Sequence, residues 1–155
     1  MQSRHYSALV LRRKLEAKPY DHLVELYQPK PRPRQWGGWP PVQIKYLGGR
    51  SEPGETPFQT LYREVEQEGG LILVESRVRE LVDVPTEDGH IQYFFEADYE
   101  GCLGRLITEV GWREENNSFI SCPFFMSINV LHSFLSPAHR IPFLKSVMRE
   151  AAATM

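Results

Sequence analysis

Short runs of apolar residues separated by polar turns predict several β-strands. Three of these runs lie in the first third of the chain: Tyr6–Arg12, His22–Tyr27 and Val42–Leu47. A fourth run, Arg105–Trp112, is expected to form a later strand. Each run is short and bounded by polar or turn-forming residues, which is typical of strands rather than helices.

A hairpin is predicted in the middle of the chain. The apolar run Leu71–Val74 is expected to continue into Arg77–Val84, and the turn cluster at residues 85–89 leads into a second strand, Ile91–Tyr99. Alternate residues of that second strand are expected on one face: Ile91, Tyr93, Phe95 and Ala97. The two strands should pair in an antiparallel manner, because the connection between them is short.

A helix is predicted to begin after Thr56 and to end at the glycine pair 69–70. Thr56 is a favourable N-cap residue, Pro57 suits the first helical position, and Gln59 is placed to complete a capping box. Glycine is common where a helix ends. The apolar residues of this segment follow helical spacing and form one stripe: Phe58, Leu61, Tyr62 and Val65.

Two more helices are predicted near the C-terminus. The first is expected from Pro123 to Leu135, with these residues inward: Phe124, Ile128, Leu131 and Leu135. The second is expected to begin near Pro142 and to bury Phe143, Leu144, Val147 and Met148. Together the elements predict one α/β or α+β domain over residues 1–155, in which helices flank a mixed sheet.

Composition excludes several classes of protein. The 155 residues are 41% hydrophobic and 25% charged, with a net charge of −2, which argues against disorder and against a general attraction to DNA or an anionic membrane. No apolar run approaches the roughly 20 residues that span a bilayer. Cys102 and Cys122 form no CxxC pair, so a zinc site or disulfide framework is not expected. Two free thiols fit the cytoplasm.

Candidate chemistry is concentrated in the predicted helix and in the loop before it. At about 100° per residue, Glu64 and Glu68 lie one turn apart on a face separate from the apolar stripe. Two unpaired carboxylates at this spacing repel each other by about 0.2–0.5 kcal/mol. A hard divalent cation such as Mg²⁺ would turn that repulsion into binding, because it prefers oxygen ligands. The ordinary alternative for such a pair is a solvated helix face.

The segment at residues 49–71 resembles the Nudix box, G-x5-E-x7-R-E-U-x-E-E-x-G-U, where U is a bulky apolar residue. Eight of its nine defined positions match: Gly49, Glu55, Arg63, Glu64, Val65, Glu68, Gly70 and Leu71. The ninth, usually glutamate, is Gln67. Agreement of the glycines, the arginine and the carboxylates favours a functional helix face over a solvated one.

The resemblance implies the Nudix fold, an α/β/α sandwich built on a mixed sheet. It also implies a hydrolase that cleaves the pyrophosphate bond of a nucleoside diphosphate linked to another moiety, with Mg²⁺ or Mn²⁺ as cofactor. By position, the implied metal ligands are Glu64, Gln67, Glu68 and the backbone carbonyl of Gly48. The expected partners are a small nucleotide and, because dimers are frequent in the family, a second copy of the chain.

The resemblance also assigns roles in catalysis. The expected catalytic residues are Arg63, Glu64, Glu68 and Glu109. A carboxylate outside the box usually helps to deprotonate water in this family, and Glu114 and Glu115 are alternatives to Glu109 for that role. An ion pair between Glu55 and Arg63 is expected to hold the loop on the helix. That pair would support the site rather than react.

Gln67 is the main departure from the family pattern. Its amide oxygen could coordinate a cation but brings no charge, so metal binding is expected to weaken. The alternative function is therefore a nucleotide-binding or sensor protein of the same fold, with weak or no hydrolysis. A second departure, Leu47 in place of a common proline, should change only the stiffness of the loop.

Three arginines outside the helix are expected to bind substrate: Arg32, Arg34 and Arg50. The first two lie in a proline-rich segment, residues 28–41, which cannot form a regular element because proline lacks the backbone donor. Cations and tryptophans in this segment suit a phosphate and a base. A solvated connector is the interpretation that the charge density of this segment favours, because three positive charges in ten residues are common, and a docking peptide for a partner protein is a weaker one.

Overall fold

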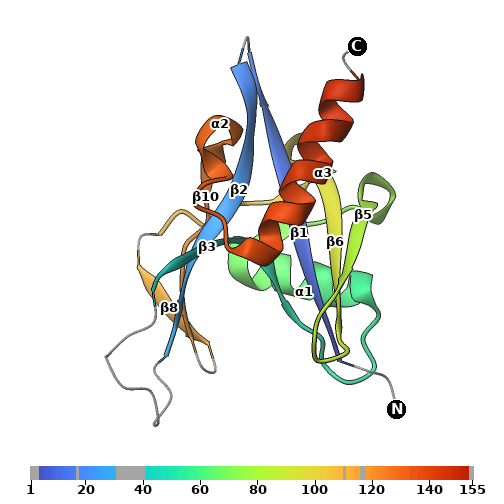
Figure 1. Ribbon diagram of the computed structural model, residues 1–155. Coiled ribbons are helices and arrows are strands. Elements are labelled where there is room, and N and C mark those ends of the chain that lie inside the picture. Colours follow the sequence, from blue (N-terminus) through green and yellow to red (C-terminus); the bar gives the residue numbers. More distant parts are fainter. Residues whose placement is uncertain (1–3, 17, 31–40, 110, 116–117, 154–155) are drawn as a thin grey trace.

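The computed structural model describes residues 4–16, 18–30, 41–109, 111–115 and 118–153. Three layers make up the fold: α1 (Pro57–Gly69) covers one face of a mixed sheet, and α2 (Ile128–Leu131) and α3 (Pro137–Ala153) lie on the other (Figure 1). The predicted α/β/α architecture is confirmed. None of the helices in the described part of the chain has the length and apolar character that crossing a bilayer requires.

The main sheet runs in the order β5-β6-β1-β3-β2-β9-β8, with β10 also paired to β2. β1 and β6 are parallel, whereas the other paired strands of this sheet are antiparallel. Its strands are β1 (His5–Leu15), β2 (Lys18–Pro29), β3 (Gln43–Arg50), β5 (Arg79–Pro85), β6 (Ile91–Asp98), β8 (Trp112–Glu115), β9 (Ser118–Ser121) and β10 (Phe124–Ser127). A second, two-stranded sheet joins β4 (Leu71–Ile72) to β7 (Leu103–Gly104), and two short 3₁₀ helices are η1 (Glu75–Arg77) and η2 (Tyr99–Gly101).

Helix α1 begins and ends where the sequence predicts. The Thr56 side chain accepts a hydrogen bond from Gln59 N at 3.2 Å, and Gln59 Oε1 accepts one from Thr56 N at 2.9 Å. These two bonds form the capping box. Gly70 ends the helix in the left-handed region, at φ 74°, and a Cβ there would lie 2.4 Å from the Arg105 carbonyl oxygen. Glycine is therefore required at this position.

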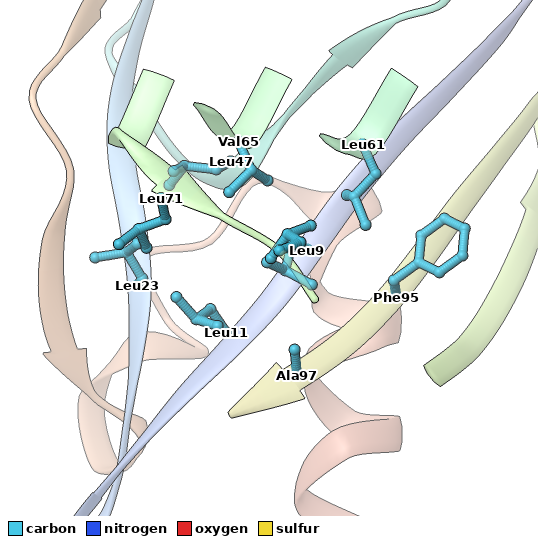
Figure 2. Close-up of a cluster of buried hydrophobic side chains, with 10 residues drawn as sticks. Leu9, Leu11, Leu23, Leu47, Leu61, Val65, Leu71, Phe95 and Ala97 are labelled. Atoms are coloured by element: carbon cyan, nitrogen blue, oxygen red, sulfur yellow. The ribbon is translucent and has the colours of Figure 1, made fainter. Parts of the chain in front are cut away.

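Each face of the sheet has its own hydrophobic core, because successive strand residues point to opposite faces. Under α1 lie Leu9, Leu11, Leu23, Leu47, Leu61, Val65, Leu71, Leu73, Phe95 and Ala97 (Figure 2). Under α3 lie Ala8, Val10, Val24, Tyr46, Leu81, Phe94, Leu131, Leu135 and Phe143. Leu47 of β3 packs in this core with Leu61 and Val65 of α1. The glycines that follow it therefore lie against that helix.

Two predictions for the region after the hairpin were wrong. Residues 105–109 form no strand, and β8 begins only at Trp112. The segment predicted as a helix from Pro123 is instead strand β10 followed by the four-residue α2. Phe124–Ser127 pairs with β2, and a short apolar run carries too little periodicity to reveal such pairing.

Two further boundaries differ from expectation. The run Leu71–Val74 does not continue directly into the next strand, because η1 separates β4 from β5. Helix α3 begins at Pro137, so Pro142 lies inside it and removes one intrahelical hydrogen bond. Its buried residues are His139, Pro142, Phe143 and Ser146, whereas Leu144 and Met148 are 47% and 68% exposed. The stripe that packs on the sheet is thus partly polar, which hydrophobic spacing did not indicate.

Candidate active site

The two glutamates of α1 face the two glycines near the end of β3, Gly48 and Gly49. Glu64 and Glu68 are only 8% and 2% exposed. Gly48 N donates to Glu68 Oε1 at 2.8 Å. A Cβ added to Gly49 would lie 2.5 Å from Glu64 Cδ, so glycine is needed to leave room for that carboxylate. The face that carries both residues therefore packs against β3 and is not a solvated face.

Arg63 connects the loop before α1 to Glu64. Its Nε and Nη2 donate to the Glu55 carboxylate at 2.8 and 2.9 Å, and its Nη1 donates to Glu64 Oε1 at 2.8 Å. The expected pair of Glu55 and Arg63 is thus present. Hydrogen bonds from Arg63 lower the pKa of Glu55 to about 2, so this carboxylate is ionised at neutral pH. The pair orients Glu64 without using the second oxygen of that residue.

Gln67 lies at the exposed edge of this cluster. Its Oε1 accepts a hydrogen bond from Arg63 Nη1 at 3.4 Å. Its backbone carbonyl accepts one from Arg113, which belongs to β8. The structure therefore brings Gln67 next to Arg63 and leaves the buried part of the cluster to Glu64 and Glu68.

Two buried charges that the sequence analysis missed complete the cluster. Glu25 in β2 is fully buried, and Lys45 in β3 is 8% exposed. They are directly opposite each other in the ladder between the two strands, and Lys45 Nζ is 2.8 Å from Glu25 Oε1. The sequence did contain a signal for this pair: Glu25 lies inside the apolar run His22–Tyr27, and Lys45 lies inside the run Val42–Leu47. Recognising it required the register between those runs, which is a tertiary property.

Burial dominates the electrostatics of this cluster. It raises the pKa of Glu68 well above its usual value; Lys45 opposes this effect, while the charges of Glu25 and Glu64 add to it. Burial likewise raises the pKa of Glu25, against the opposing effect of Lys45. For Lys45, burial alone would lower the pKa, but the carboxylates of Glu25 and Glu68 raise it well above the usual value. Lys45 is therefore cationic.

The carboxylates of α1 fit a divalent cation. Glu68 Oε2 is buried and accepts no hydrogen bond from an N–H group or hydroxyl of the described residues, and the Glu68 carboxyl group interacts with that of Glu25. A carboxylate oxygen in that condition, one helical turn from a second carboxylate, is suited to a hard cation. No set of three or more His, Cys, Asp or Glu side chains is arranged to hold a metal ion in the described ranges. Glu64 and Glu68 are the two buried carboxylates of α1 that could hold the cation, and the role of Gln67 stays a prediction.

The Gly48 carbonyl fits its expected role as a metal ligand less well than the two glutamates do. Its oxygen already accepts a hydrogen bond from Lys45 Nζ at 3.2 Å. A cation that used this oxygen would meet the positive charge of Lys45 at close range. Gly48, which lies in β3, therefore offers less to a metal ion than the resemblance implies.

The other sequence-predicted residues lie outside this cluster. Arg50 is exposed, and its backbone carbonyl accepts a hydrogen bond from Arg63 at 3.0 Å. Glu109 is exposed in the segment between β7 and β8, and Glu114 is exposed and paired with Lys30. Arg32, Arg34 and the side chain of Glu115 lie outside the described residues. The roles of Arg50 and Glu109 stay predictions.

The sequence matches the NUDIX domain over residues 4–140. The chain is a member of the Nudix family. This match spans the three predicted catalytic residues of α1 and the strands that carry Glu25 and Lys45. A search of curated proteins returned no match.

Solved structures share the Nudix fold at low sequence identity. A structure of MutT, from a study of the Aliivibrio salmonicida and Vibrio cholerae proteins, has 16% identity and a TM-score of 0.60, and the match covers 95% of this chain and 98% of that one. A Caenorhabditis elegans Ap4A hydrolase complex has 14% identity and a TM-score of 0.57, covering 95% and 98%. The Trypanosoma brucei MERS1–RNA complex has 18% identity and a TM-score of 0.53, covering 63% of this chain and 34% of that one.

Proposed function

We propose that this Nudix protein hydrolyses the pyrophosphate bond of a nucleoside diphosphate derivative, with Mg²⁺ or Mn²⁺ bound by Glu64 and Glu68. The products would be a nucleoside monophosphate and a phosphorylated second moiety. The observation that carries the proposal is the buried pair of carboxylates held by Arg63 and Gly48, with one oxygen of Glu68 lacking a hydrogen-bond donor among the described residues.

The residues of the chain are arranged for positioning and charge stabilisation, which phosphoryl transfer mainly requires. Arg63 fixes the Glu64 carboxylate, and Gly48 N fixes Glu68. Neither group needs to reorganise when substrate binds. A divalent cation at these carboxylates would offset charge on the diphosphate and lower the pKa of a bound water.

Groups at the edge of the site complete the proposal. Arg50 is the last residue of β3, and its exposed guanidinium suits a substrate phosphate. Arg32 and Arg34 are proposed for the same purpose. Glu109 is proposed to accept the proton of the attacking water, which adds to phosphorus as the bridging P–O bond breaks.

A release assay over a panel of substrates tests this function. The panel contains nucleotide sugars, dinucleoside polyphosphates, nucleoside triphosphates and capped RNA ends, each with Mg²⁺, Mn²⁺ or chelator. We expect at least one substrate to be cleaved and the cleavage to stop with chelator. Glu64→Gln should abolish that turnover, whereas Glu66→Gln, which changes an exposed residue of the same helix, should not. Failure to cleave any substrate contradicts the proposal.

A second candidate function is nucleotide binding with weak or no hydrolysis. It is favoured by Gln67, which brings no charge, and by the contact between Lys45 and the Gly48 carbonyl. Equilibrium binding of the same nucleotides separates the two candidates. Binding without product release, in both metals and at high protein concentration, supports the second candidate over the first.

A further inference from the structure

The ammonium group of Lys45 is surrounded by oxygen atoms of the kind that bind metal ions. Its Nζ lies 2.8 Å from Glu25 Oε1, 3.2 Å from the Gly48 carbonyl oxygen and 3.3 Å from the Tyr46 carbonyl oxygen. An ammonium has three N–H donors and no acceptor, so these three oxygens can satisfy it. A carboxylate and two carbonyl oxygens are also ligands that a hard cation uses.

The sheet imposes this position on Lys45. Lys45 pairs with Glu25 across the ladder of β3 and β2, and Gly48 follows three residues later in the same strand. The ring centroids of Tyr6 and Tyr27 are 5.9 and 5.8 Å from Nζ, a distance at which an aromatic ring attracts a cation. The positive charge is therefore held inside the site, against the Gly48 carbonyl, rather than at the surface.

A salt bridge that only stabilises the fold would explain Lys45 and Glu25, but it would not explain the buried carboxyl group of Glu68 next to them. Glu68, which is only 2% exposed, lies beside them. Gly48 N donates to its Oε1, and its Oε2 accepts no hydrogen bond from an N–H group or hydroxyl in the described chain. Among neighbouring charges, Lys45 has the largest effect on both Glu25 and Glu68, in a place where uncompensated charge is costly. Lys45 supplies part of the compensation that a metal ion would give.

We propose that the ammonium group of Lys45 takes the place of one divalent ion in the Nudix site. It donates a hydrogen bond to the Gly48 carbonyl oxygen and offsets the acidic groups of Glu25 and Glu68. The inference rests on the proposed function, because it assumes that this cluster is the active site. Lys45 is then a positioning residue: it acts through Gly48 and the carboxylates. The consequence is that the protein binds divalent cations weakly, through Glu64 and Glu68 without the Gly48 carbonyl.

Titration of the full chain with Mn²⁺ in the absence of nucleotide tests this inference, with free Mn²⁺ measured by electron paramagnetic resonance. Lys45→Met removes the ammonium and keeps an unbranched chain of similar length. We expect the Kd for Mn²⁺ to fall by about tenfold or more, because the carbonyl and the carboxylate charge become available. Lys30→Met is the matched control, since it removes one lysine charge from a pair with exposed Glu114. Its Kd should stay within about twofold of the unmodified protein, because exposed charges are screened.

A double variant keeps the test decisive if Lys45→Met fails to fold. Lys45→Met with Glu25→Gln removes one charge of each sign, and it should still bind Mn²⁺ several times more tightly than the unmodified protein because the Gly48 carbonyl is free. An unchanged or higher Kd in the folded variant overturns the inference. No turnover is measured, so absence of hydrolysis in the substrate panel would contradict the proposed function without changing the outcome of this titration.

Discussion

Arg12 and Glu96 on the α3 face of the sheet form a buried charge network that can be compared with Lys45, Glu25 and Glu68 on the α1 face. Arg12 donates to Asp98 Oδ1 at 2.9 Å, and its Nη1 lies 2.7 Å from Glu150 Oε2. Both oxygens of Glu96, which is 1% exposed, have partners: Arg79 Nε lies 2.8 Å from one, and the Ser146 hydroxyl donates to the other. The α1 network has no such complete pairing.

The difference lies in the number of oxygens without a donor. Glu68 Oε2 and Glu25 Oε2 accept no hydrogen bond from an N–H group or hydroxyl of any described residue, and the two carboxyl groups interact with each other. A buried acceptor that lacks a donor destabilises the folded state by about 1–3 kcal/mol. A network that serves only stability has no reason to retain that cost, whereas a ligand-binding site does. Completeness of pairing therefore separates the scaffold on one face from the candidate site on the other.

The largest effect is expected on the α3 face. Glu96→Leu leaves Arg79 and the Ser146 hydroxyl without their shared acceptor and removes the carboxylate that lies 4.0 Å from Arg12. Loss of one member of a buried pair costs about 3–5 kcal/mol of unfolding free energy. Urea unfolding measures it, with Glu80→Leu as an exposed control in β5 that should change stability by less than about 0.5 kcal/mol. Equal losses in the two variants would remove the structural role assigned to the α3 network.

The opposite pattern is expected for Glu68→Gln on the α1 face. Loss of one charge-stabilising group lowers turnover by roughly 10²–10³, or about 2.7–4 kcal/mol of activation free energy. The unfolding free energy should stay the same or rise, because a buried carboxylate with a raised pKa becomes a neutral amide. Steady-state kinetics and urea unfolding on the same samples check both. A variant that keeps its turnover but loses stability contradicts the comparison.

Acid should act oppositely on the two faces. Burial lowers the pKa of both His22 and His139, which pack on the α3 side, to about 3. Between pH 6.5 and 3 the unfolded chain binds protons that the folded histidines do not, so each removes up to about 1.4 kcal/mol of stability per pH unit as pH falls. Glu25 and Glu68 have raised pKa values, so they favour the folded state as pH falls towards 4.5.

Stability measured against pH separates these contributions. His22→Phe should reduce the loss of unfolding free energy between pH 6.5 and 4, because one depressed histidine is removed. Its stability at pH 7 is not the criterion, since the hydrogen bond between His22 Nδ1 and the Tyr46 hydroxyl at 2.8 Å is lost as well. An unchanged slope would place the acid sensitivity elsewhere in the molecule.

The smallest effect is expected for Gln67→Glu. The new carboxylate would lie next to Arg63 and near Glu64, so without metal the change should destabilise the fold by no more than about 0.2–0.5 kcal/mol. With Mg²⁺ or Mn²⁺ the variant should gain more stability than the unmodified protein, because ligand charge strengthens binding. Thermal melts across a metal titration measure both. An identical metal response would mean that position 67 does not face the cation.

Much of the candidate site could be predicted because most of its residues lie close together in the sequence. Glu55, Arg63, Glu64 and Glu68 lie within one loop and helix, so the spacing of the box and the capping residues places them together. The same reasoning failed beyond the hairpin, where Phe124–Ser127 became a strand. Its partner, β2, is remote in sequence, and no local propensity encodes that pairing.

The sequence by itself determined the extent of α1, the hairpin of β5 and β6, and the family to which the chain belongs, since these depend on residues a few positions apart. Only the tertiary structure decided that Lys45 meets Glu25 and the Gly48 carbonyl. It also decided which buried carboxylates are fully paired. The physical reason is that strand register joins residues far apart in sequence, and the burial that raises the pKa of Glu68 comes from packing of α1 on the sheet.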